Sequence, residues 1–153
     1  MNILSIYKPN KKGTGHAMSL KISEDNALML EIVKQSGYEN GNGVFKQPKD
    51  KDGVKAVVKL SDFEASNIIY SIEKNKPLGL FHKTASSQKQ IKFQPEGSER
   101  RVGSESVQER MVKFNISEGD HFYGMFLDAS ESQLIVEAMR YYLMFLFQTR
   151  RSA

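Results

Sequence analysis

The chain has 153 residues, of which 39% are hydrophobic, 26% charged and 10% aromatic, a composition typical of one globular domain rather than a disordered or fibrous chain. It contains no cysteine, which excludes a disulfide framework, a thiolate metal site and a cysteine nucleophile, and which favours an intracellular compartment, cytoplasm or nucleoid. Lys and Arg number 22 against 18 Asp and Glu, and the net charge of +4 is compatible with nucleic acid as a partner.

The first half of the chain predicts four strands and a helix. Residues 1–15 carry a cluster of lysines around Pro9 and no hydrophobic period, so we expect a flexible basic N-terminal arm. Runs that alternate between hydrophobic and polar residues predict strands at residues 16–22, 28–32, 44–47 and 55–60. Ser61 or Asp62 is a suitable N-cap, and hydrophobic residues at helical spacing predict a helix from there to Asn75.

The second half repeats this order of elements. Its patterns predict strands at residues 78–84, 89–94, 110–116 and 121–127, and a helix at 130–147. The segment 97–109 is rich in Ser, Gly and Glu and is the longest expected flexible loop. The halves also match in residue type at an offset of 67 positions, where Leu60 and Glu64 correspond to Leu127 and Glu131.

We therefore predict one α+β domain over residues 16–150, built from two pseudo-repeats, 16–76 and 77–148. Each pseudo-repeat is expected to form an antiparallel four-stranded sheet followed by a helix, with the helices buried inside and the sheets outward. The last helix is hydrophobic on all sides over residues 134–147, so one sheet cannot cover it. We expect a homo-oligomer, a dimer or higher, formed through this helix. The segment is too short and too charged to span a membrane.

Lysine and aromatic residues on the predicted strands indicate a binding surface. By the period of two, several lysines lie opposite the hydrophobic side of their strands and form a positive sheet face. Aromatic residues off the core face are free to stack on unpaired bases, while lysines contact phosphates. We add the loop arginines to this set, and the candidate nucleic-acid-binding residues are Lys21, Phe45, Lys46, Lys55, Lys59, Phe81, Lys83, Lys92, Arg100, Arg101, Lys113 and Tyr123.

The sequence contains no recognisable catalytic pattern. The three histidines are far apart, without the spacing of a metal site, and the acidic pairs fall in predicted turns, where backbone conformation explains them. We expect no catalytic residue, no metal ligand and no cofactor, and the interpretation is that the protein is not an enzyme.

Three segments resemble the single-stranded-DNA-binding coactivator family called positive cofactor four. Residues 53–62, Gly-Val-Lys-Ala-Val-Val-Lys-Leu-Ser-Asp, are similar to the strand and helix start of that family, and residues 28–32 to its second strand. Residues 127–134, Leu-Asp-Ala-Ser-Glu-Ser-Gln-Leu, are similar to the same helix start of the family and repeat it in the second half of the chain. Two units in one chain resemble the Whirly proteins, which are fused pairs of such units.

The resemblance implies binding of single-stranded DNA by a curved sheet surface, in transcription, replication, recombination or repair. It implies a DNA contact for Lys55, which matches the lysine of the family's Gly-x-Lys motif. The chain has no counterpart of the family's stacking Trp, so strand alternation offers Phe45, Phe81 and Tyr123 instead. The expected function is non-catalytic, largely sequence-independent binding of single-stranded DNA. RNA as the ligand, or a structural oligomeric β protein without nucleic acid, remain the alternatives.

Overall fold

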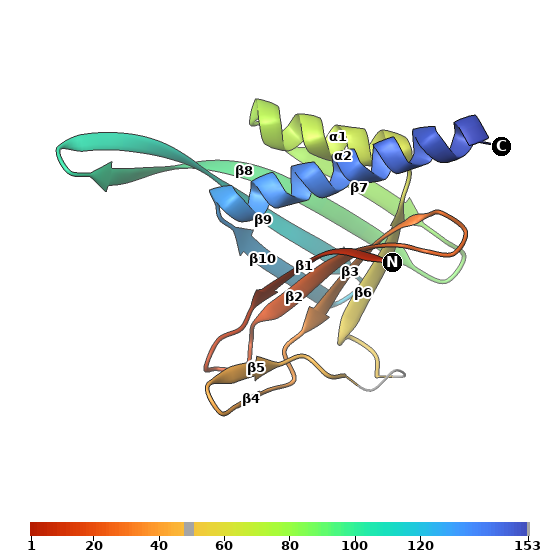
Figure 1. Ribbon diagram of the computed structural model, residues 1–153. Coiled ribbons are helices and arrows are strands. Elements are labelled where there is room, and N and C mark those ends of the chain that lie inside the picture. Colours follow the sequence, from red (N-terminus) through yellow and green to blue (C-terminus); the bar gives the residue numbers. More distant parts are fainter. Residues whose placement is uncertain (48–50, 153) are drawn as a thin grey trace.

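The computed structural model describes residues 1–47 and 51–152 and has the α+β class. Two antiparallel four-stranded sheets, a small two-stranded ribbon and two helices make up the chain (Figure 1). The elements are β1 Asn2–Lys8, β2 His16–Ile22, β3 Leu28–Lys34, β4 Gly37–Glu39, β5 Asn42–Val44, β6 Lys55–Leu60, α1 Asp62–Lys74, β7 Leu78–Lys83, β8 Gln88–Val102, β9 Glu105–Glu118, β10 His121–Leu127 and α2 Ala129–Ser152.

The two halves of the chain share an order of four sheet strands followed by a helix. The first sheet has the order β1-β2-β3-β6 and leads into α1, and the second sheet has the order β10-β9-β8-β7 and leads into α2. The α+β class, the antiparallel sheets and the C-terminal helix are as predicted. The ribbon of β4 and β5 is an additional element inserted between β3 and β6.

Both helices begin with the same reciprocal capping pattern. Ser61 accepts a hydrogen bond from the backbone N–H of Glu64, whose carboxylate accepts one from the N–H of Ser61. Asp128 and Glu131 make the equivalent pair of bonds at the start of α2. Such a capping box satisfies N–H groups that have no partner inside the helix. The two caps lie 67 positions apart, the offset seen between the sequence halves. Helix α1 ends at Asn75, which adopts a left-handed conformation with φ 57°.

Three expectations about local structure are wrong. The predicted arm over residues 1–15 is a strand in its first part, because β1 pairs with β2 and buries Ile6. The predicted loop at 97–109 is the end of a long hairpin, in which β8 and β9 stay paired up to Val102 and Glu105. This hairpin projects beyond the helices (Figure 1). The short strand expected at 44–47 lies earlier, at β5.

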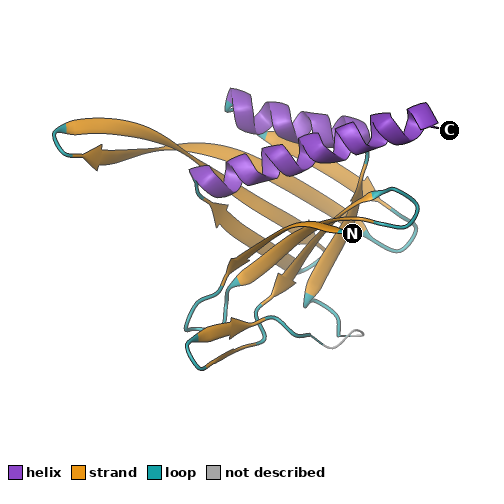
Figure 2. Cartoon of the chain, in the orientation of Figure 1, coloured by secondary structure: helices purple, strands orange, loops and turns teal. Residues whose placement is uncertain are grey.

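A single hydrophobic core is enclosed by the two sheets and the two helices. The inward side chains of both sheets belong to one cluster, in which the rings of Phe93 and Phe114 stack with their centroids 4.8 Å apart. Helices α1 and α2 lie side by side across this core (Figure 2). They are not buried inside as predicted, because their outer sides remain exposed, as at Phe63 and Phe147.

No helix in residues 1–47 and 51–152 combines the length and hydropathy that a membrane span requires.

Candidate nucleic-acid interface

The outward face of the second sheet carries three exposed aromatic rings. Phe81 on β7 and Phe122 and Phe126 on β10 are 58%, 54% and 48% exposed. The strand register places Phe81 and Phe122 at the two ends of one row, with Gln90 and Ser117 between them. Neighbouring strands lie about 4.8 Å apart, so the two rings are separated by the width of the sheet, about 14 Å. We call the outward face of the four-stranded part of this sheet, made of β7, residues 88–94, residues 113–117 and β10, the aromatic platform.

The Phe122 ring lies over Gly124, which follows it on the same face. A Cβ atom added at Gly124 would lie 2.8 Å from Cε1 and 3.2 Å from Cζ of the Phe122 ring. Any side chain at this position would therefore push the ring away from the strand. The glycine leaves space for the ring to cover the backbone, while about half of the Phe122 side chain remains exposed.

Lysines surround these rings. The side chains of Lys83, Lys92 and Lys113 are exposed. The register places Lys92 in the row beside that of Phe122 and Lys113 in the row of Phe126. Lys113 Nζ lies 5.8 Å from the centroid of the Phe126 ring. All outward positions in the four-stranded part of this sheet are described, and none is Asp or Glu. These positions lie in β7, Gln88 to Gln94, Lys113 to Ser117 and Phe122 to Phe126. The platform is therefore positive and aromatic, without a carboxylate among its side chains.

The first sheet presents a second group of lysines on its own outward face. Lys21, Lys55 and Lys59 are exposed. Lys21 Nζ lies 3.9 Å from a carboxylate oxygen of Glu31, and Lys59 Nζ lies 3.4 Å from Asp25. This face is partly neutralised by neighbouring carboxylates, in contrast to the aromatic platform.

The prediction that Tyr123 faces outward is wrong. Its side chain is completely buried in the core, and its hydroxyl donates a hydrogen bond of 3.1 Å to the backbone oxygen of Lys55. The His16 ring packs against it edge to face, with 6.4 Å between centroids, and Lys34 Nζ lies 5.0 Å from its centroid. Burial raises the pKa of Tyr123 above its ordinary value. Tyr123 links the two sheets and is not available to a ligand.

The remaining candidates lie away from the platform. Phe45 is half-buried beside Tyr7, with ring centroids 5.6 Å apart, and Lys46 is exposed in the loop that follows it. Arg101 is exposed near the end of the β8–β9 hairpin. The side chain of Arg100 lies outside the described part of the structure.

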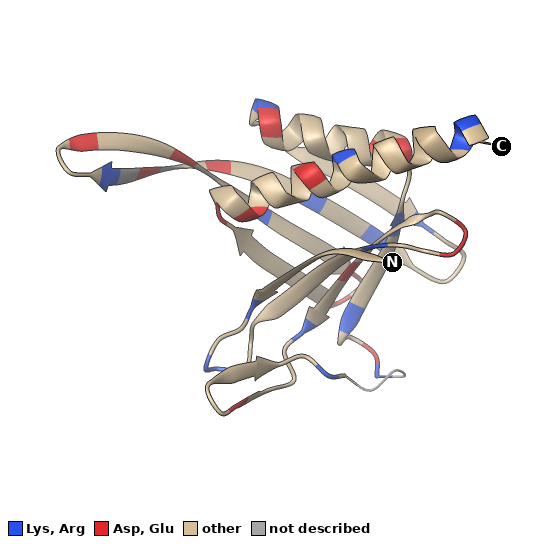
Figure 3. Ribbon diagram, viewed as in Figure 1, with Lys and Arg blue, Asp and Glu red and all other residues tan. Residues whose placement is uncertain are grey.

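The predicted residues that are described and exposed on the sheets therefore lie on two surfaces rather than one. Both sheets turn their inward sides to the same core, so their outward faces look in different directions. Lys and Arg are distributed over both sheets and the hairpin (Figure 3). Phe81, Lys83, Lys92 and Lys113 gather on the platform. Arg100 and Arg101 are adjacent in the sequence and stand between Glu99 and Glu105.

Sequence reasoning missed Phe122, Phe126 and the polar side chains of Gln90 and Asn115 between the rings. One signal was available for Phe122 and Phe126. They flank Gly124 at spacings of two, and a glycine between two aromatic residues on one face is typical of a ring that covers a strand backbone.

The histidines lie at separate places. The pKa of His16 is lowered, because burial disfavours its charged form and because Lys34 is nearby. His82 Nε2 lies 2.6 Å from Glu64 Oε2, which connects β7 to α1. Throughout residues 1–47 and 51–152, His, Asp and Glu side chains form no group of three or more suited to a metal ion.

Comparisons with known proteins inform the fold alone. No protein-family model and no curated protein matches the chain. Among solved structures, the chain is similar to Trypanosoma bruciei MRP1/MRP2, with a TM-score of 0.61 and 13% identity. The similarity covers 94% of this chain and 84% of that chain. The two therefore share their fold over most of their length, and at this identity the likeness carries no function.

Proposed function

We propose that this protein binds single-stranded DNA, largely independently of sequence and without catalysing a reaction. The observation that carries the proposal is the aromatic platform, where three exposed phenylalanine rings lie among three lysines with no carboxylate among the described outward side chains of that four-stranded part. An intracellular location is part of this proposal.

The platform can perform both parts of such binding. Every base has an aromatic face, so stacking on Phe81, Phe122 and Phe126 tolerates any sequence and contributes about 1–3 kcal/mol per base. Lysine ammonium groups attract phosphates and release the counterions bound to them. Bases in a duplex are already stacked on their neighbours and cannot reach the rings. Duplex DNA should therefore bind more weakly than a single strand of the same length.

The proposal includes a relationship to the family of positive cofactor four and the Whirly proteins, as a fused two-unit member. Two units of four strands and a helix, with equivalent capping boxes, support this relationship. Lys55, the residue that matches the family's Gly-x-Lys motif, is exposed at the start of β6. Membership would place the protein in transcription, replication, recombination or repair.

A binding comparison tests the proposal directly. Fluorescence anisotropy is measured with labelled oligothymidine, oligouridine and a duplex of equal length. We expect the single strands to bind more tightly than the duplex. The logarithm of the affinity should fall with the logarithm of the salt concentration, at a slope of about −0.7 for each phosphate contacted. Tighter binding of oligouridine would assign the protein to RNA, and no binding to any of the three would favour a structural role.

We also propose that a second copy of the chain covers the outer side of the helices. This side exposes large hydrophobic residues on both helices, and a hollow of about 280 Å³ lies between Phe63 and Phe147. The exposed set comprises Phe63, Tyr70, Leu134, Tyr141, Met144 and Phe147. Exposed hydrophobic patches of this kind mark interaction surfaces. Phe147→Glu should shift the protein to the monomer in sedimentation equilibrium, and an unchanged mass would contradict this assignment.

A further inference from the structure

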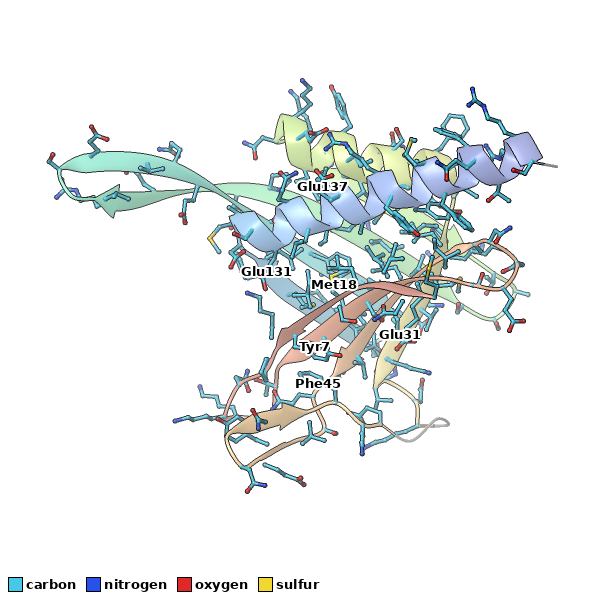
Figure 4. The ribbon with its side chains drawn as sticks, in the orientation of Figure 1. Tyr7, Met18, Glu31, Phe45, Glu131 and Glu137 are labelled. Atoms are coloured by element: carbon cyan, nitrogen blue, oxygen red, sulfur yellow. The ribbon has the colours of Figure 1, made fainter. Side chains whose placement is uncertain are left out.

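A groove of about 240 Å³ lies on the outward face of the first sheet, separate from the aromatic platform. Its floor is formed by side chains of β2 and β3, and its walls come from β1 and from the segment after β5. Figure 4 labels three of its lining residues, Tyr7, Phe45 and Glu31. The register places Tyr7 toward one end and Lys21 toward the other, with Ser19 and Glu31 in the row between them. The groove thus combines rings, hydroxyls, one carboxylate and one ammonium group.

Glu31 occupies the centre of this face. The register places it in a row with Ser5, Ser19 and Val57 across all four strands. It is the one carboxylate among the outward positions of β1, β2, β3 and β6, all of which are described. Its side chain is 28% exposed, and Lys21 Nζ is 3.9 Å away, beyond hydrogen-bond distance. Within residues 1–47 and 51–152, the Glu31 carboxylate forms no hydrogen bond, so both oxygens are available as acceptors.

The rings at the end of the groove are held by the small ribbon. Tyr7 and Phe45 have centroids 5.6 Å apart with an interplanar angle of 56°. A side chain at Gly43 on β5 would collide with Pro9 and approach Phe45, so the ribbon packs closely on the segment after β1. Tyr7 remains 61% exposed. A planar ligand in the groove can therefore stack on an aromatic residue while one edge meets Glu31.

We propose that this groove binds a guanine base of the single strand and reads its Watson–Crick edge through Glu31. The proposal rests on the proposed function, because the base arrives as part of a bound nucleic acid. A carboxylate only accepts hydrogen bonds. Guanine presents two adjacent donors, N1–H and the N2 amino group, which match the two oxygens of one carboxylate. Adenine and cytosine present a donor beside an acceptor, and thymine presents one donor between two carbonyl oxygens.

The charges around Glu31 favour a base over a phosphate at this point. Glu31 repels phosphate, whereas Lys21, Lys55 and Lys59 lie in neighbouring positions of the same face and attract it. A strand that crosses the sheet would place its backbone near the lysines and turn a base toward the carboxylate. A base without two donors leaves the carboxylate partly unpaired, which weakens its binding. The site therefore discriminates both by its contact with guanine and by its poor contact with the other bases. This preference adds to the sequence-independent affinity of the platform.

A substitution within one oligonucleotide tests the proposal. Anisotropy is measured with oligothymidine that carries one central guanine, adenine, cytosine or inosine, and with the unmodified strand. Inosine keeps N1–H and lacks the amino group. We expect guanine to bind about fivefold more tightly than thymine, because a bidentate contact at a partly exposed site lies at the weak end of such pairs. Inosine should fall between them.

Glu31→Gln is the matched variant, and Glu105→Gln, an exposed position on β9 near the end of the hairpin, is the control. Glu31→Gln should abolish the guanine preference and tighten binding of unmodified oligothymidine, because it removes a negative charge. Glu105→Gln should keep the preference. Circular dichroism and the melting temperature establish that both variants fold.

Three results would overturn the assignment in different ways. Equal binding of all five strands by the wild-type protein would refute the guanine site and leave the proposed function intact. No binding of any strand would refute both. A Glu31→Gln variant that keeps the full guanine preference would show that another group reads the base.

Discussion

Truncation of one ring on the platform separates ligand binding from stability. Phe122 is 54% exposed, so about half of its side chain contributes to packing. Complete burial of a phenylalanine stabilises a protein by about 1.5–3 kcal/mol, and Phe122→Ala should therefore lower the free energy of unfolding by about 1 kcal/mol. In a domain of this size, that loss lowers the melting temperature by roughly 2–4 °C.

The effect of Phe122→Ala on binding should be larger. Loss of one stacked base costs about 1–3 kcal/mol, which raises the dissociation constant roughly 5- to 150-fold. The assay is anisotropy with an oligothymidine short enough to cover one platform, so that contacts to a second subunit do not contribute. Urea denaturation of the same preparations gives the change in stability.

Two variants serve as controls for Phe122→Ala. Phe63→Ala removes a ring that is 78% exposed on α1, and the affinity should stay unchanged. Phe114→Ala removes a completely buried ring and should cost about 3–5 kcal/mol of stability. The reasoning is refuted if Phe122→Ala binds as tightly as the wild type, or if Phe63→Ala weakens binding equally.

Three further predictions concern the platform and the core. Gly124→Ala should weaken binding about two- to fivefold by displacing the Phe122 ring. In the Phe122→Ala background it should have no further effect on affinity, because contacting residues act non-additively, and additive effects would contradict this account. The double variant Lys92→Ala, Lys113→Ala should reduce the slope of log affinity against log salt concentration by about 0.7 for each phosphate that these lysines bind in the wild type. An unchanged slope would show that the phosphates bind elsewhere. Burial lowers the pKa of His16, so protonation favours the unfolded chain, and the free energy of unfolding should be highest above about pH 6.5 and fall below it. In urea denaturation, His16→Gln should show a smaller fall than the wild type.

Elements with strong local signals were predictable from the sequence. Helix α1 begins with a capping box and ends at Asn75 before a proline, and both signals are local. Strand β1 and the end of the β8–β9 hairpin carry weaker signals. Within β1, all of which is described, only Ile6 is buried, because the strand lies at the edge of its sheet. Residues 96–110 are mostly polar on both sides, so no hydrophobic period marks them as strands.

The site was predictable in part, and the error at Tyr123 has a physical reason. Strand β10 has hydrophobic residues on both sides, with Phe122 and Phe126 outward and Tyr123 and Met125 inward. A period of two cannot decide which side of such a strand faces the core. The choice depends on contacts from distant parts of the chain, such as the hydrogen bond from Tyr123 to Lys55. Lys92 and Lys113 lie on strands with a clear polar side, and their outward orientation could be predicted.

The length of the β8–β9 hairpin has a consequence for local opening of the chain. Strand β7 pairs with β8 only as far as Phe93, and β10 pairs with β9 only back to Val112. Beyond these points, no strand in the described part of the chain pairs with either outer edge of the hairpin. This part is held by its own cross-strand pairs and adds little to the core. Its backbone amides should exchange with deuterium well before those of β8 and β9 within the sheet, and a protease should cut near Gly103 while the rest of the domain stays folded.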